Sequence, residues 1–110
     1  MNKVDQETTK KIQELQALEQ GLQNIALQKQ AFQLELDEAE NSLEEIKKTK
    51  EDVYKLVGQI MIKGDKKTIE KEIDQKKEIL KIRTTTLEKQ EQEIEKNLEK
   101  LKKEVLGKIK

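Results

Sequence analysis

The chain has 110 residues, of which 42% are charged and 33% are hydrophobic; its 23 basic residues balance 23 acidic ones, and it has no Cys and no His. This composition excludes disulfides, thiolate metal sites and imidazole acid–base chemistry. Balanced charge and a single Arg disfavour nucleic acid as a partner, because phosphate binding needs a surplus of positive charge. So little apolar material predicts either disorder or a structure that buries only a narrow seam.

Two further classes of protein are disfavoured before any element is placed. No apolar run approaches the roughly 18 residues of a membrane span, and the N-terminus lacks the apolar core of a signal peptide. We therefore expect a cytoplasmic protein with no membrane partner. The four glycines are isolated and form no phosphate-binding loop, and the many carboxylates read as solvated helix faces. We expect no cofactor, no metal and no enzymatic activity.

The first predicted element is a helix over residues 1–52. Its apolar residues recur at alternating spacings of three and four, which is the pattern of a coiled-coil seam. Lys29 and Lys50 interrupt this pattern, and we interpret them as residues that specify the register or extend to solvent. We expect Phe32 to be a core residue. The seam positions are Leu15, Leu18, Leu22, Ile25, Lys29, Phe32, Leu36, Ala39, Leu43, Ile46, Lys50 and Val53.

The second predicted element is a β-hairpin over residues 53–63, VYKLVGQIMIK. The periodicity changes here to runs of β-branched residues on either side of Gly58-Gln59, which suits a two-residue turn with Gly at its first central position. Gly64-Asp65 then marks a break. Asp65 is predicted to be the N-cap of the next helix, with its carboxylate accepting from the first free amides.

The third predicted element is a helix over residues 65–110, with one apolar residue in every seven: Ile73, Leu80, Leu87, Ile94 and Leu101. Its register stays open. If these five are heptad a positions, the d positions are Lys76, Arg83, Gln90, Asn97 and Glu104. If they are d positions, the a positions are Lys77, Thr84, Glu91, Leu98 and Val105. Ile94 then lies opposite either Leu22 or Ile25.

Because the hairpin reverses the chain, the sequence predicts a mainly α single domain in which two long helices form an antiparallel coiled coil joined by a β-hairpin. An isolated hairpin is marginal in water, and this one carries apolar groups on both faces and two unpaired edges. We expect it to join a shared sheet or barrel with other chains. The alternative is a hairpin that packs down on its own helix ends, which are mostly charged.

Three segments of this sequence resemble the archaeal prefoldin β subunit family: Gln28-Lys29-Gln30 in the first helix, the hairpin from Val53 to Ile62, and Leu87-Glu88-Lys89-Gln90-Glu91 in the second helix. The resemblance covers nearly the whole chain. It implies a single prefoldin-like domain over 1–110 whose hairpin enters an oligomeric β-barrel body. A single hairpin fits the β class better than the α class, which carries two.

The resemblance implies an ATP-independent chaperone subunit. In the family, two α-type and four β-type subunits form a hexamer whose coiled-coil tips hold unfolded polypeptides and deliver them to a group II chaperonin. The alternative is a structural or adaptor coiled coil without general holding activity. The residues expected to mediate oligomerisation are Val53, Tyr54, Leu56, Val57, Gly58, Ile60, Met61 and Ile62.

The candidate client-binding residues lie near the two chain ends, which the antiparallel fold brings together. They are Val4, Ile12, Leu15, Leu18, Leu98, Leu101, Val105 and Ile109. Between residues 98 and 109 the apolar set is too wide for one seam partner, and Gly21 and Gly107 each weaken their helix by roughly 1 kcal/mol relative to Ala. The alternative role of these residues is simply to close the coil.

Overall fold

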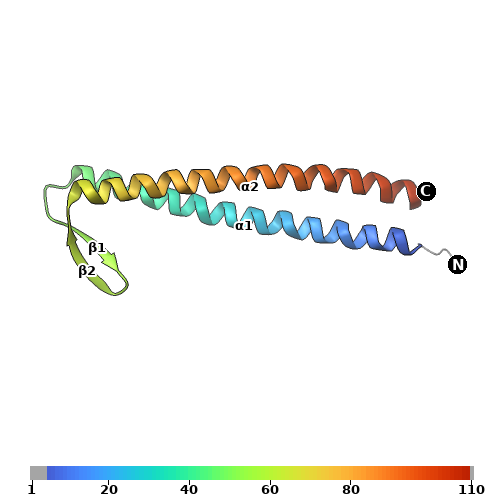
Figure 1. The fold of residues 1–110 in the computed structure, drawn as a ribbon, viewed down its shortest axis with the longest axis horizontal. Helices are drawn as coiled ribbons and strands as arrows, with labels where there is room; N and C mark the ends of the chain where they lie inside the picture. The colour runs from blue at the N-terminus through green and yellow to red at the C-terminus, as the bar shows by residue number, and fades with distance from the viewer. Residues whose placement is uncertain (1–4, 110) are drawn as a thin grey trace. The chain divides into compact units, whose positions relative to one another are not determined.

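The structure is a computed structural model that describes residues 5–109, and the side chains of residues 5–108. Its elements are α1 (Gln6–Lys48), β1 (Val53–Val57), β2 (Ile60–Gly64) and α2 (Lys66–Ile109), so the predicted order is confirmed (Figure 1). The chain forms two compact units. The terminal unit comprises Met1–Gln30 with Thr85–Lys110, and the hairpin unit comprises Ala31–Thr84.

Both helices begin with an Asp that is followed three residues later by Thr. The carboxylate of Asp5 accepts from the backbone N–H of Thr8 at 2.7 Å. The carboxylate of Asp65 accepts from the backbone N–H of Thr68 at 3.1 Å and from its hydroxyl at 2.9 Å. These are N-cap bonds to otherwise unpaired amides. The cap predicted at Asp65 is confirmed, and Asp5 repeats it.

The first helix ends earlier than the predicted residue 52. Its last turn closes with the Thr49 amide donating to the carbonyl of Glu45, after which the Glu51 amide donates to the hydroxyl of Thr49 at 3.2 Å. A Thr hydroxyl that accepts a nearby amide competes with the helical bond and stops the helix. Lys50 is therefore an exposed linker residue, and Val53 begins β1 instead of continuing the seam.

In the terminal unit the two helix segments run antiparallel. Lys11 pairs with Glu104 at 3.2 Å and Lys29 pairs with Glu91 at 3.3 Å, so the partner number falls as the α1 number rises. A Cβ built on Gly21 would lie 3.7 Å from Cδ1 of Ile94. This contact favours the pairing in which the next residue, Leu22, lies opposite Ile94.

Burial settles the register of α2. On the side facing α1, the heptad series from Ile73 to Leu101 alternates with Lys77, Thr84, Glu91, Leu98 and Val105, all of which are half-buried or buried. Of the competing set, Lys76, Arg83, Gln90 and Asn97 are exposed and Glu104 alone is half-buried. The five heptad residues are therefore d positions.

The core of the hairpin unit is a thin layer of aliphatic side chains between α1 and α2. Its buried members are Ala39, Leu43, Ile69 and Leu80. Thr84 shares this layer and satisfies its hydroxyl by donating to the carbonyl of Leu80 at 2.9 Å. A polar residue can stay on the buried side in this way without leaving an unpaired group.

The hairpin pairs Val53 with Gly64 at its base and Val57 with Ile60 at its turn, so the second strand runs one residue beyond the predicted end. Gly58 has φ of 63°, and no non-glycine residue in the described part of the chain has a positive φ. Positive φ at the first central position alone defines a type II′ turn, whose twist matches that of the paired strands.

Candidate functional site

The hairpin leaves its apolar side chains uncovered. The exposed fractions of Tyr54, Leu56, Val57, Ile60, Met61 and Ile62 run from 50% to 68%. Neither helix end covers them, so the alternative in which the hairpin packs down on its own helix ends is wrong. An apolar cluster of this kind on a two-stranded sheet is typical of a surface that a partner covers.

The two faces of the hairpin differ in their surroundings. Directly paired residues share a face, so Lys55, Val57, Ile60 and Ile62 form what we call the inner face, and Tyr54, Leu56, Met61 and Lys63 form the outer face. The ammonium of Lys55 lies 2.8 Å from a carboxylate oxygen of Glu72 on α2, which turns the inner face toward that helix. The sheet has only these two strands among the described residues, so each strand has one edge without a neighbour.

Gly64 fixes the base of the hairpin against the helix that follows it. A Cβ at this position would collide with the side chain of Ile69, which is itself buried. Lys66 also donates to the carbonyl of Thr49 at 3.0 Å and so connects the two ends of the hairpin segment. The base is therefore tightly packed, whereas the turn is open.

In the terminal unit, the described tip candidates all lie on the seam side. Leu101 and Val105 are buried, whereas Ile12, Leu15, Leu18 and Leu98 are half-buried. Val4 and the side chain of Ile109 lie outside the described residues. Among the large aliphatic side chains that the structure describes near this end, Leu106 is the most exposed, at 59%. Leu106 belongs to the apolar set between residues 98 and 109 that is too wide for one seam partner, but it was not one of the eight candidate client-binding residues; its exposure separates it from the seam residues.

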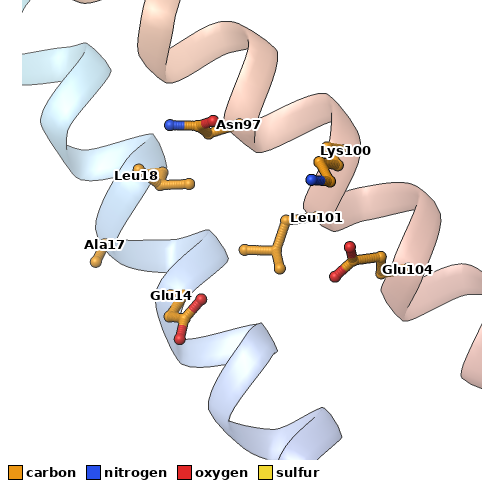
Figure 2. A pocket seen from close by; sticks show the side chains of 7 residues that line it. All are labelled: Glu14, Ala17, Leu18, Asn97, Lys100, Leu101 and Glu104. Carbon is orange, nitrogen blue, oxygen red and sulfur yellow. The ribbon is translucent and has the colours of Figure 1, made fainter.

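An open groove of about 450 Å³ lies between the helices of the terminal unit. Figure 2 shows Leu18 and Leu101 reaching into the space between α1 and α2. Glu14, Lys100 and Glu104 lie around them, and the lining is completed by Ala17 and Asn97. This terminal groove combines an apolar floor with charged groups of both signs.

Ion pairs join the two helices beside the terminal groove. Lys11 lies 3.2 Å from Glu104 and Lys108 lies 3.5 Å from Glu7, and Lys11 also pairs with Glu7 within α1 at 3.7 Å. The hydrogen bond to Glu104 raises the pKa of Lys11 above its ordinary value. These pairs align the helix ends at the surface, where single pairs contribute little stability.

The chemistry available at both places is burial of apolar surface. Within residues 5–109, no group of three or more Asp or Glu side chains is arranged to hold a metal ion. In the same stretch, every buried side-chain polar atom has a hydrogen-bond partner. None of the described helices is long and apolar enough to cross a membrane.

An antiparallel helix pair joined by an uncovered apolar hairpin is typical of one class of protein, the oligomer subunit whose exposed hairpin is covered by a partner chain. Comparison with known proteins gives the particular family. The family model described as "Prefoldin subunit" matches residues 9–110. The chain therefore belongs to the prefoldin family, whose members are subunits of hetero-oligomeric chaperones.

The similar relatives are of the β class. The "Prefoldin subunit beta" of Thermococcus onnurineus is 41% identical over 90 residues, which cover 80% of this chain and 78% of the relative. That of Saccharolobus islandicus is 36% identical over 101 residues, covering 90% and 80%. The crystal structure of the prefoldin beta subunit from Thermococcus strain KS-1 matches with a TM-score of 0.84 at 33% identity and covers 97% of this chain and 96% of that one.

Proposed function

We propose that this chain is a β-type subunit of an ATP-independent holding chaperone in the cytoplasm. It assembles through its hairpin with α-type subunits and further β copies, as a hexamer of two α and four β. Its terminal unit holds unfolded polypeptides, which the complex passes to a group II chaperonin. The observation that carries this proposal is that each of the two compact units has an apolar surface of its own. One is the uncovered hairpin, and the other is the groove and exposed Leu106 in the terminal unit.

The two surfaces suit different tasks. The hairpin offers strand edges with directional hydrogen-bonding groups, which favour a partner of fixed geometry. The terminal groove offers an apolar floor with charges of both signs around it, and apolar burial is non-directional, so it accepts many unrelated chains. We therefore assign assembly to the first surface and client binding to the second.

The test compares two matched double variants in the complex with an α-type partner. Ala17→Glu with Leu106→Glu changes exposed residues at the terminal unit's groove end, whereas Ala26→Glu with Leu27→Glu changes an exposed Ala and Leu elsewhere in the same unit. We expect the first variant to need several-fold more complex to suppress light scattering by a diluted, denatured client, and the second to behave as the unchanged chain.

Equal protection by both variants would contradict client binding at this end. The measurement is repeated with three unrelated clients, because a holding chaperone protects all of them. Protection of none, or of one alone, would favour the adaptor function instead.

A further inference from the structure

The hairpin and α2 form a wedge within the hairpin unit. The wedge is closed where Gly64 meets Ile69, and Lys55 spans it to reach Glu72 at 2.8 Å. Val57, two residues beyond Lys55, points to the same side about 6.6 Å further along the strand. The inner face of the hairpin is therefore the face on the side of α2, and Figure 1 shows the hairpin leaving the beginning of α2 at an angle, with its turn away from the helices.

The part of α2 that follows Glu72 carries exposed isoleucines. Ile79 lies seven residues after Glu72, on the same face of the helix and about 10.5 Å further along it. Ile79 is 50% exposed and Ile82, one turn further on, is 64% exposed. Ile79 also lines a shallow hollow on this helix with Lys71, Asp74, Gln75 and Glu78. We call Ile79 and Ile82 the α2 outer stripe.

The stripe is not explained by the coiled coil. The seam of α2 is on the opposite side, with Leu80 and Thr84 facing α1. β-branched residues are also weaker helix formers than the Lys, Glu and Gln that occupy most outer positions. Two exposed isoleucines one turn apart, beside an uncovered apolar hairpin, therefore extend the same apolar surface.

We infer that the α2 outer stripe is a second assembly surface, and that it receives the hairpin of a neighbouring prefoldin-type subunit. This inference rests on the proposed assembly through the hairpin. When a neighbouring strand pairs with a free hairpin edge, the sheet widens by about 4.8 Å, and the new strand presents alternate side chains on the inner face. Those side chains then lie over α2, where Ile79 and Ile82 cover them.

The surroundings of the stripe fit this occupant better than an unfolded client. The stripe belongs to the same compact unit as the hairpin, whereas the terminal groove belongs to the other unit. The surface is continuous with the hairpin through the Lys55–Glu72 pair.

The first experiment measures assembly with an α-type partner by sedimentation over a range of concentrations. We expect Ile79→Glu to raise the concentration at the midpoint of assembly at least tenfold, while circular dichroism reports unchanged helix content. Leu27→Glu is the matched control, since it places the same charge at an exposed aliphatic position of the other unit. Equal midpoints for the two variants would overturn the inference, as would lost client protection with unchanged assembly.

The hairpin double variant I60D/I62D separates this inference from the proposed function. If I60D/I62D still assembles, hairpin-mediated assembly itself fails. If I60D/I62D dissociates and Ile79→Glu does not, only the inference about the stripe fails.

A second experiment identifies the neighbour directly. The chain has no Cys, so Ile79→Cys carries a single thiol that takes a benzophenone photo-cross-linker. In the assembled complex without client, we expect the cross-linked peptide to come from the hairpin of another subunit. Cross-linking to the same chain only, or to none, would overturn the inference, and Leu27→Cys with the same label gives the background.

Discussion

At the scale of single residues, both helices depend on the same short pattern, Asp-x-x-Thr. The amide of Thr8 donates to Asp5 and lowers the pKa of that carboxyl below its ordinary value. At Asp65, the hydroxyl of Thr68 is the larger cause of the lowered pKa and its amide the second. In each case the charged carboxylate is the better acceptor, so the cap is strongest when the Asp is ionised.

The first prediction concerns the pH dependence of the Asp65 cap. Because the pKa of Asp65 is lower in the folded state, its stabilisation is present above the unfolded pKa of about 4 and is lost as pH falls through the folded pKa. We expect Asp65→Ala to lower the melting temperature at pH 7 by a few degrees, and this difference to close in acid below about pH 4. Thermal unfolding followed by circular dichroism measures it.

Two substitutions control this result. Asp65→Asn keeps an amide-capping side chain without a titrating group, so its loss relative to the unchanged chain should be small at pH 7 and should vanish in acid. Asp74→Ala removes an exposed Asp from inside α2, where Ala is the better helix former, and should not lower the melting temperature. A difference for Asp65→Ala that is constant from pH 7 to pH 2 would refute the charged cap.

The second prediction concerns Gly58. No atom lies within 4 Å of a Cβ built there, so the cost of Gly58→Ala comes from φ of 63° alone. That cost is about 1–2 kcal/mol in the hairpin. We expect Gly58→Ala to weaken assembly with an α-type partner about tenfold in native mass spectrometry, and Gly58→Asn, which tolerates positive φ better, to weaken it less. Unchanged assembly of the Gly58→Ala variant would show that assembly does not depend on this turn.

Some residue-scale features could be predicted from the sequence and others could not. The N-cap at Asp65 could be predicted because Asp65 lies between Gly64, which interrupts the hairpin pattern, and the apolar heptad pattern of the second helix. Asp5 caps the first helix in the same way, but no glycine precedes it to mark the helix start. The end of α1 at Lys48 could not be predicted, because the heptad pattern continues formally through Lys50 and Val53. What stops the helix is the local bond from Glu51 to the Thr49 hydroxyl, which periodicity does not encode.

At the scale of elements, the coiled coil tolerates a polar pair inside its seam. Lys29 and Glu91 both occupy seam positions, and their side chains keep 31% and 26% of their surface exposed. Their ion pair at 3.3 Å lets two charged residues replace an apolar contact without an unpaired buried charge.

The third prediction tests this pair by charge reversal. Lys29→Glu opposes two carboxylates and should destabilise the chain in urea unfolding, and adding Glu91→Lys should recover most of the loss. Because both groups are partly solvated, we expect a coupling free energy of about 0.5–1 kcal/mol that shrinks in high salt. The same cycle at Lys48 and Glu44, whose side chains are 68% and 63% exposed, gives the surface reference and should show less coupling. If the changes in unfolding free energy caused by the two substitutions simply add, Lys29 and Glu91 do not stabilise each other.

The fourth prediction concerns the hairpin. Replacing Ile60 and Ile62 with Asp puts two carboxylates on the inner face, and burying them in a shared sheet costs several kcal/mol. We expect loss of the oligomer in sedimentation, with most of the helix content retained, because the coil does not depend on these exposed side chains. Leu27→Asp with Leu34→Asp, on exposed outer positions of α1, is the control. The same assembly in both double variants would show that the hairpin is not the assembly element.

The order of the elements was predictable, but their register was not. The switch from heptads to β-branched residues around Gly58 predicted helix, hairpin and helix correctly. The register of α2 stayed open because either choice puts polar residues in the seam. The structure resolves it with interactions that pattern reasoning does not weigh, namely the Thr84 bond to Leu80 and the Lys29–Glu91 pair. The apolar set near the chain ends was predicted with Leu106 in it, but the exposure of Leu106, which separates it from the seam residues, was not.

At the scale of the whole molecule, the chain buries little apolar side-chain surface and leaves a large amount of it exposed. Among residues 5–108, few side chains are buried and most of these are aliphatic, while the apolar residues of the hairpin stay exposed. Balanced Lys and Glu on the remaining surface keep such a subunit soluble without attracting one sign of partner. We therefore expect assembly to stabilise the hairpin and to leave the terminal unit as the region that meets clients.

The fifth prediction tests this division of labour by removing residues 1–11 together with 103–110. The deletion takes away the ion pairs of Lys11 and Lys108 and the exposed Leu106, but it leaves the hairpin and the central seam in place. In a complex with an α-type partner, we expect sedimentation to show the full oligomer. Suppression of light scattering by a diluted, denatured client should fall several-fold.

For the undeleted complex, protection should be indifferent to ATP, because the sequence has no phosphate-binding loop. It should weaken only modestly between 50 mM and 500 mM salt, since apolar burial supplies the main driving force and screening acts on the charges around it. A loss of the oligomer on deletion would mean that the terminal unit also carries assembly. Equal protection by the deleted and full-length complexes would place the client site outside the terminal groove, toward the hairpin body. A steep fall in protection with salt would mean that clients bind mainly to the Lys and Glu side chains, rather than to Leu18 and Leu101.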